Sequence, residues 1–126
     1  MIIRTKHYTG IAAAAIVGAA LFRAPLVLAH AFPEAVQPGV GAVLHDAPKL
    51  VRIRYDSGLE EEFSEIVVKD SNGNRVSGRT KLDPASRKTL EAGLKDLEPG
   101  DYHVYWTVVS WDGHRTKGDY VFHFNP

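Results

Sequence analysis

The sequence has no cysteine among its 126 residues, and its only methionine is Met1. A chain without cysteine forms no disulfide, presents no thiolate ligand to a metal ion and has no thiol nucleophile. It also lacks a basic stripe interleaved with aromatic residues, the usual mark of a protein that binds nucleic acids. We therefore expect neither a thiolate metal site nor a nucleic-acid partner.

The longest apolar run lies close to the amino end, over residues 11–22, and two basic residues precede it. A positive segment, an apolar run of this length and small residues before a cleavage point are the three parts of a secretory signal peptide. Ala29 suits the last position of such a signal. We predict that residues 1–29 are a signal peptide and that residues 30–126 form the mature domain.

Two other interpretations of the amino end stay open. The tripeptide Ala29-His30-Ala31 also matches the A-x-A cleavage pattern, and cleavage after Ala31 would make Phe32 the first residue. An uncleaved membrane anchor is the second alternative. It is disfavoured because the apolar run is shorter than the ~20 residues of a spanning helix and Arg23 interrupts its extension. Cleavage after Ala29 would leave His30 at the amino terminus.

The predicted mature domain has 97 residues, enough for one modest hydrophobic core. Of the 15 basic and 15 acidic residues of the chain, three basic and no acidic ones precede position 30. The mature domain therefore carries a net charge of −3 when its histidines are neutral. Nothing in its composition indicates a linker or a second domain.

Short segments of alternating apolar and polar residues follow one another along the mature domain, separated by turn sequences. This pattern is typical of half-buried strands, and its regular spacing predicts an all-β fold, an antiparallel β-sandwich of about seven strands. Residues 57–65 are only weakly helical and are as well explained as a loop. The clearest predicted strands are residues 49–55, 65–69, 89–94, 101–110 and 118–124.

Two separated parts of the sequence together suggest a metal site. An amino-terminal His30 would offer both its amine and its ring nitrogen, while Asp112 and His114 flank Gly113 and can point to one side of the chain. If the first strand starts where the 112–114 turn lies, three nitrogens and one oxygen come together. Such a donor set suits tetragonal Cu(II) best among the common divalent metals.

Ordinary explanations exist for each of these residues taken singly. An Asp-Gly-His tripeptide is a common turn, and a histidine after a signal peptide is often a coincidence. His103 and His123 alternate with core residues and are expected to face solvent, where they could form at most a weak adventitious metal site. His45 is expected in a solvated loop.

The chain resembles the CopC family of periplasmic copper-resistance proteins. The resemblance covers residues 30–126 and includes the leader ending in Ala-His-Ala and the Leu-x-Pro-Gly-x-Tyr-x-Val-x-Trp segment at 97–106. Its most specific part is the Val-Ser-x-Asp-x-His segment at 109–114, which is followed by Gly118.

This resemblance implies an immunoglobulin-like Greek-key sandwich that binds one Cu(II) per chain through His30, Asp112 and His114. It further implies a monomeric periplasmic protein without catalytic turnover, which carries or buffers copper. An inner-membrane copper transporter of the CopD type is the implied partner.

Two departures from the family pattern limit what is carried over. Some members have a methionine-rich Cu(I) site, whereas this chain would lose Met1 with its leader, so no Cu(I) site is expected. Members also commonly carry a Phe-Ser-Glu run that here reads Tyr55-Asp56-Ser57. A carboxylate that supports the metal ligands is therefore either missing or shifted to Asp56.

Two functions of other classes remain as alternatives. A copper oxidase of the polysaccharide-cleaving type also begins with histidine. However, Asp112 would fill the fourth equatorial position that O₂ needs, and 97 residues leave little area for a flat substrate platform. A metal-free sandwich that binds a protein partner would be favoured if cleavage fell after Ala31.

Overall fold

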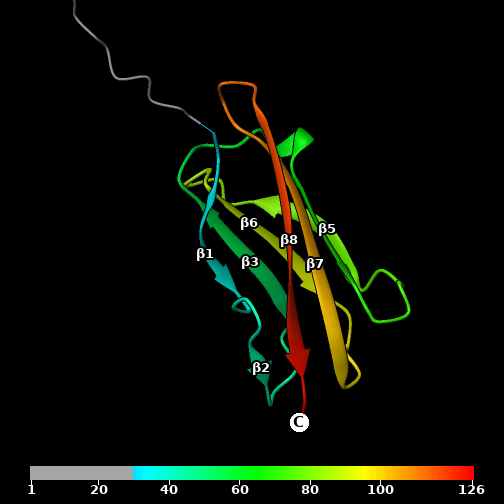
Figure 1. Ribbon diagram of the computed structural model, residues 1–126. Coiled ribbons are helices and arrows are strands. Elements are labelled where there is room, and N and C mark those ends of the chain that lie inside the picture. Colours follow the sequence, from blue (N-terminus) through cyan, green and yellow to red (C-terminus); the bar gives the residue numbers. More distant parts are fainter. Residues whose placement is uncertain (1–29) are drawn as a thin grey trace, which may run out of the picture.

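The computed structural model describes residues 30–126, and the predicted signal peptide, residues 1–29, lies outside the described residues. The described chain forms two four-stranded sheets that pack face to face (Figure 1). The predicted all-β sandwich is confirmed, with eight strands where about seven were expected. The additional strands are short or polar and carry little sequence signal.

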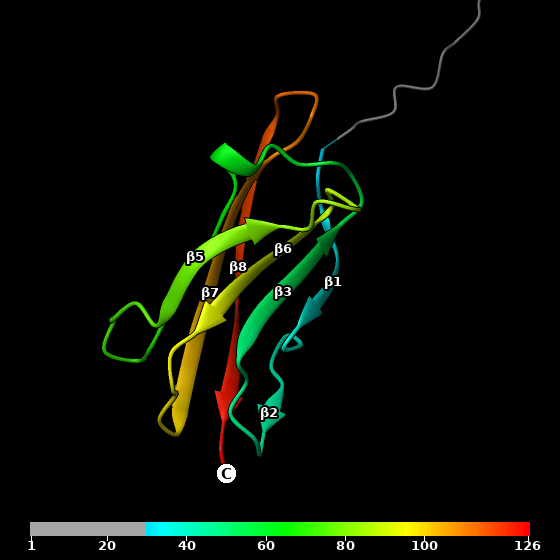
Figure 2. The ribbon, with the colours of Figure 1, turned by 180° about the vertical axis from the view of Figure 1, so that it is seen from behind.

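The first sheet has the strand order β1-β3-β6-β5 and faces the viewer in Figure 2. Its strands pair antiparallel, and the central pair places Val51 opposite Ala92 and Ile53 opposite Leu90. All four of these side chains are buried because they occupy the inward positions of their strands. The strands are β1 (Pro33–Gln37), β3 (Leu50–Tyr55), β6 (Thr89–Leu94) and β5 (Ser77–Leu82).

The second sheet has the order β2-β8-β7-β4. Its centre is a long hairpin in which β7 and β8 pair over ten residues each, from Gly100 opposite Phe124 to Val109 opposite Arg115. The short β2 strand departs from the antiparallel pattern and runs parallel to β8. The strands are β2 (Val43–Leu44), β8 (Arg115–Phe124), β7 (Gly100–Val109) and β4 (Glu65–Lys69).

The core lies between the sheets and follows the alternation of the sequence. Along β7, Tyr102, Val104 and Val108 point inward and are buried, and Trp106 packs half-buried against the core. Tyr102 also donates its hydroxyl to the carbonyl of Glu98, which is the contact of a tyrosine corner. Each large apolar side chain fully buried contributes roughly 1.5–3 kcal/mol relative to an exposed one.

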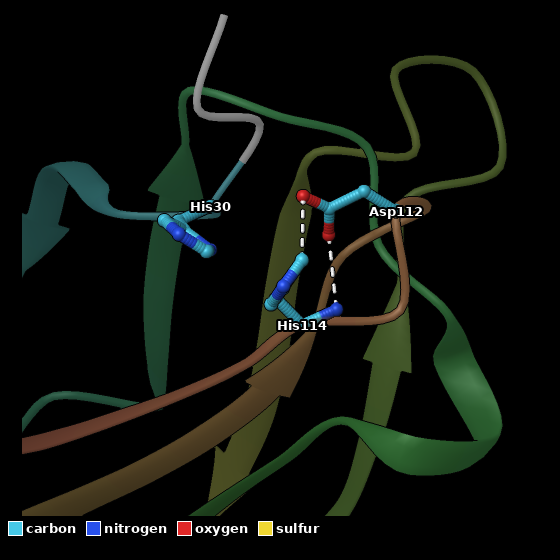
Figure 3. A group of neighbouring side chains, drawn as sticks. All are labelled: His30, Asp112 and His114. Carbon is cyan, nitrogen blue, oxygen red and sulfur yellow. Dashed lines mark hydrogen bonds and ion pairs between the residues drawn. The ribbon is translucent and has the colours of Figure 1, made fainter. Parts of the chain in front are cut away.

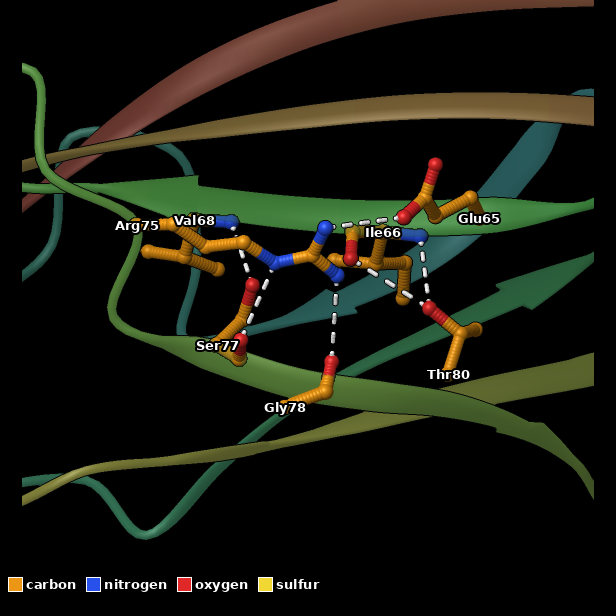
Figure 4. Close-up of polar contacts among 7 residues, drawn as sticks. All are labelled: Glu65, Ile66, Val68, Arg75, Ser77, Gly78 and Thr80. Atoms are coloured by element: carbon orange, nitrogen blue, oxygen red, sulfur yellow. Dashed lines mark hydrogen bonds and ion pairs between the residues drawn. The ribbon is translucent and has the colours of Figure 1, made fainter.

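One open side of the sandwich is closed by side chains rather than by strand pairing. β4 and β5 are edge strands of different sheets, and hydroxyls of β5 bond to the backbone of β4 (Figure 4). The amides of Ile66 and Val68 donate to Thr80 Oγ1 and Ser77 Oγ, each at 2.9 Å. These bonds satisfy edge groups that would otherwise be free to pair with another chain.

The connection from β3 to β4 crosses the end of the sandwich where the β7–β8 turn also lies (Figure 1). Residues 57–65 were expected as a weak helix or a loop. They form a loop with a single short 3₁₀ turn, Glu61–Phe63, and the last of them, Glu65, begins β4. Within residues 30–126 no helix is long and apolar enough to cross a membrane.

Candidate metal site

The chain enters β1 at the same end of the sandwich as the turn between β7 and β8. This arrangement brings His30, Asp112 and His114 together, and Figure 3 shows the three side chains around one point. Each residue offers one ligand atom, and these atoms lie within 4.8 Å of one another. The rings of His30 and His114 meet edge to face with centroids 4.5 Å apart. All three residues proposed from the sequence therefore lie close enough to share one ion.

The turn between β7 and β8 presents two of these residues. Asp112 and His114 were expected to project to one side as alternating residues of a strand, but β7 ends at Val109 and β8 begins at Arg115. They converge because the chain turns at Gly113, which has a φ of 84° and donates its amide to Ser110 O at 2.8 Å. Glycine adopts this left-handed conformation without the steric cost of a side chain.

The carboxylate of Asp112 is held by its own turn. Its Oδ1 accepts hydrogen bonds from the Ser110 hydroxyl and from the His114 amide, the latter at 2.9 Å, while Oδ2 lies 3.0 Å from His114 Nδ1. The Ser110 hydroxyl, followed by the His114 amide, lowers the pKa of Asp112 to about 2. The group is thus an anion at neutral pH, as an oxygen ligand for a cation needs to be.

The segment that carries His30 is held by contacts distant in sequence. Ala31 is fully buried, and its carbonyl accepts a hydrogen bond of 2.6 Å from the hydroxyl of Thr116 on β8. The amide of Phe32 donates to Asp56 Oδ1 at 2.9 Å. These bonds fix the segment that leads into β1, and they place His30 beside the turn.

Sequence reasoning identified some of these supporting residues and missed others. Asp56 was named as the possible site of a shifted carboxylate, and it holds the backbone next to His30. Ser110 and Thr116 were not recognised as supports. For Ser110 a signal existed, since a serine stands where the inward row of β7 would continue with an apolar residue.

The site is open to an incoming ion. Asp112 and His114 are exposed, and His30 is half-buried. Trp111 is also exposed, and its ring lies directly over Gly58, where a Cβ would come within 2.6 Å of the ring. The indole Nε1 donates to the carbonyl of Leu59 at 3.2 Å, which joins the turn to the β3–β4 connection.

The histidines expected outside the site lie where they were predicted. His103 and His123 face outward from β7 and β8, and each is paired with a carboxylate of the neighbouring strand. The pairs are His103 with Asp119 at 2.5 Å and His123 with Asp101 at 2.6 Å. Among residues 30–126, His30, Asp112 and His114 form the only group of three histidine or acidic side chains whose ligand atoms all lie within 4.8 Å of one another.

Residues 34–125 match the family model described as the CopC domain. The chain is 37% identical over 100 residues to Protein YobA of Escherichia coli K12. The aligned region covers 78% of this chain and 81% of YobA. It is also 36% identical over 92 residues to the Copper transport protein CutJ of Bacillus subtilis. That match spans 71% of this chain but 17% of CutJ.

Solved structures share the fold. CopC from Methylosinus trichosporium OB3b superposes with a TM-score of 0.73 and 32% identity, over 77% of this chain and 95% of that protein. PcoC, a methionine-rich copper resistance protein from Escherichia coli, has a TM-score of 0.69 over 77% of this chain and all of PcoC. Its identity of 21% supports the likeness of fold alone.

Proposed function

We propose that this chain, which belongs to the CopC family of copper-binding proteins, is a periplasmic Cu(II) carrier or buffer with one metal site. The site consists of His30, Asp112 and His114. The observation that carries the proposal is the convergence of their ligand atoms within 4.8 Å of one another. The match of residues 34–125 to the CopC domain supports copper as the metal.

The donor chemistry of these residues fits Cu(II). His30 supplies its ring nitrogen and, after cleavage behind Ala29, its amine, while His114 supplies a third nitrogen and Asp112 an oxygen. Three nitrogens and one oxygen favour a tetragonal Cu(II) centre. Soft Cu(I) ligands are absent, since the mature domain contains neither cysteine nor methionine. The cargo is therefore one Cu(II) ion, and no Cu(I) site is proposed.

Packing of Ala31 supports cleavage after Ala29 rather than after Ala31. Ala31 is fully buried in the core cluster, and its carbonyl partners the Thr116 hydroxyl. A chain beginning at Phe32 would lose both contacts and would leave a gap in the core. A chain beginning at His30 keeps them and presents the amine beside the two ring nitrogens.

The same geometry favours a carrier over an oxidase. A ligand oxygen of Asp112 lies within 4.8 Å of the histidine ligand nitrogens, so in a copper complex it would take the equatorial position that an O₂-activating copper would keep open. We propose no catalytic turnover. As a partner we propose an inner-membrane copper transporter of the CopD type. In CutJ, named as a copper transport protein, the segment similar to this chain is part of a much longer protein.

The experiment that tests the proposal is a Cu(II) titration of the exported, processed protein with its mass and EPR spectrum recorded. We expect a mass that begins at His30, one equivalent of tightly bound Cu(II), and nitrogen-rich tetragonal parameters. A mass beginning at Phe32, or no stoichiometric binding, would overturn the site. A partner-binding sandwich would then become the leading function.

A further inference from the structure

Ser110 is an unusual residue for its position. Its side chain is 0% exposed, and a hydroxyl in such a place costs free energy unless it is hydrogen-bonded. In residues 30–126 the other buried polar residues are Ser64 and Ser77, and their hydroxyls accept bonds from backbone amides. Ser110 instead donates to the carboxylate of Asp112. Its hydroxyl therefore serves a side chain of the candidate metal site.

The backbone around Ser110 holds this hydroxyl in place. The Ser110 amide donates to His114 O at 3.0 Å, and the Ser110 carbonyl accepts from the Gly113 amide at 2.8 Å. Ser110 also forms an isolated antiparallel β-bridge with Leu59, in the connection between β3 and β4. The hydroxyl also lies 3.3 Å from His114 O. These contacts fix Ser110 at the start of the turn that carries Asp112 and His114.

The two carboxylate oxygens of Asp112 have different partners. Oδ1 is engaged by the Ser110 hydroxyl and the His114 amide, whereas Oδ2 faces the His114 ring. We infer that Ser110 is a positioning residue, which restrains Asp112 so that it binds copper through the single oxygen Oδ2. This inference rests on the proposed function, because it assumes that Asp112 is a copper ligand.

The restraint has a physical consequence for the metal. A carboxylate without the Ser110 bond would rotate more freely, and it could turn away from the ion or bind with both oxygens. Groups that orient a metal ligand typically contribute a factor of about 10–100 to metal affinity. Ser110 thus affects both the strength and the geometry of Cu(II) binding without touching the ion.

The test compares S110A with S110T, which keeps the hydroxyl, and with S77A, which removes a buried hydroxyl outside the site. We expect S110A to bind Cu(II) about 10–100-fold more weakly, with altered EPR hyperfine parameters. S110T should restore the EPR parameters, and S77A should lower the melting temperature while leaving them unchanged. Wild-type affinity and an unchanged spectrum in S110A would overturn the inference.

A double-mutant cycle shows whether Ser110 acts through Asp112. If it does, S110A/D112A should bind Cu(II) as D112A does, because the restrained group is gone. Full additivity of the two losses would overturn the positioning role. Failure of the proposed function looks different, since D112A would then match the wild type or the wild type would bind no stoichiometric Cu(II).

Discussion

The two halves of the candidate metal site are held in different ways. Asp112 and His114 lie in one turn, and the bonds that orient them come from residues within four positions of each other. His30 lies at the start of the described chain and is placed by Thr116, whose bond to Ala31 joins residues 85 positions apart. The turn half is thus organised locally, whereas the amino-terminal half depends on the assembled sandwich.

Removing the imidazole ring of His114, in the turn half of the site, should have the largest effect on metal binding. We expect H114A to lower Cu(II) affinity by more than about 100-fold, beyond the range typical for losing a group that only orients a ligand. The fold should remain intact because His114 is exposed. Competition titration measures the loss, with H103A as a control in which a half-buried histidine outside the site is removed. Equal affinities of H114A and wild type would contradict the site.

Blocking the amine of the terminal half should have the next largest effect. One alanine placed before His30 turns the amine into an amide and removes a nitrogen donor, while every side chain remains. We expect a loss on the order of 100-fold at pH 8. An α-amine has an ordinary pKa of about 7.7–8.0, so wild-type affinity should also rise with pH up to that range.

The variant with an alanine before His30 should lose most of this increase of Cu(II) affinity with pH. Cu(II) titrations of this variant and of the wild type from pH 6 to 9 measure the difference. Identical pH profiles of the two forms would show that the amine takes no part in binding.

Loosening the tertiary contact should have a smaller effect. T116V keeps the shape of the side chain but leaves the Ala31 carbonyl without its hydroxyl partner. We expect unfolding to become easier by about 1 kcal/mol and Cu(II) to dissociate several-fold faster, because His30 is less well placed. Chemical denaturation and stopped-flow chelator competition measure the two effects. T107V, on the outward face of β7, is the control, and equal behaviour of both variants would contradict the anchoring role.

Acid titration of the metal-free protein should show the smallest effect. The pKa of Asp112 is lowered from 3.8 to about 2, so folding favours its ionised form. Its contribution to stability is present above pH 3.8 and disappears as the pH falls toward 2. D112N should therefore show a shallower loss of stability across this window. Identical acid unfolding curves of D112N and wild type would rule the contribution out.

The strands predicted best are those with a regular alternation of buried and exposed residues. Residues 101–110 and 118–124 correspond to β7 and β8, although β8 begins earlier, at Arg115. β5 was missed because its sequence, Ser77 to Leu82, is polar and contains a glycine. An edge strand of this kind is defined by its pairing with β6 and by hydroxyl bonds to β4, which no local pattern reveals.

The sequence by itself determined the donor chemistry of this protein. Without cysteine, and with methionine only at position 1, the side chains that can bind a metal are limited to histidine nitrogens and carboxylate oxygens. It also determined the sandwich, since alternation of apolar residues dictates which faces are buried. Only the tertiary structure decided that His30, Asp112 and His114 converge. It also decided that Thr116, Asp56 and Ser110 hold the segments that carry them. The physical reason is that strand packing, rather than local preference, brings His30 and the segment before β1 to the β7–β8 turn.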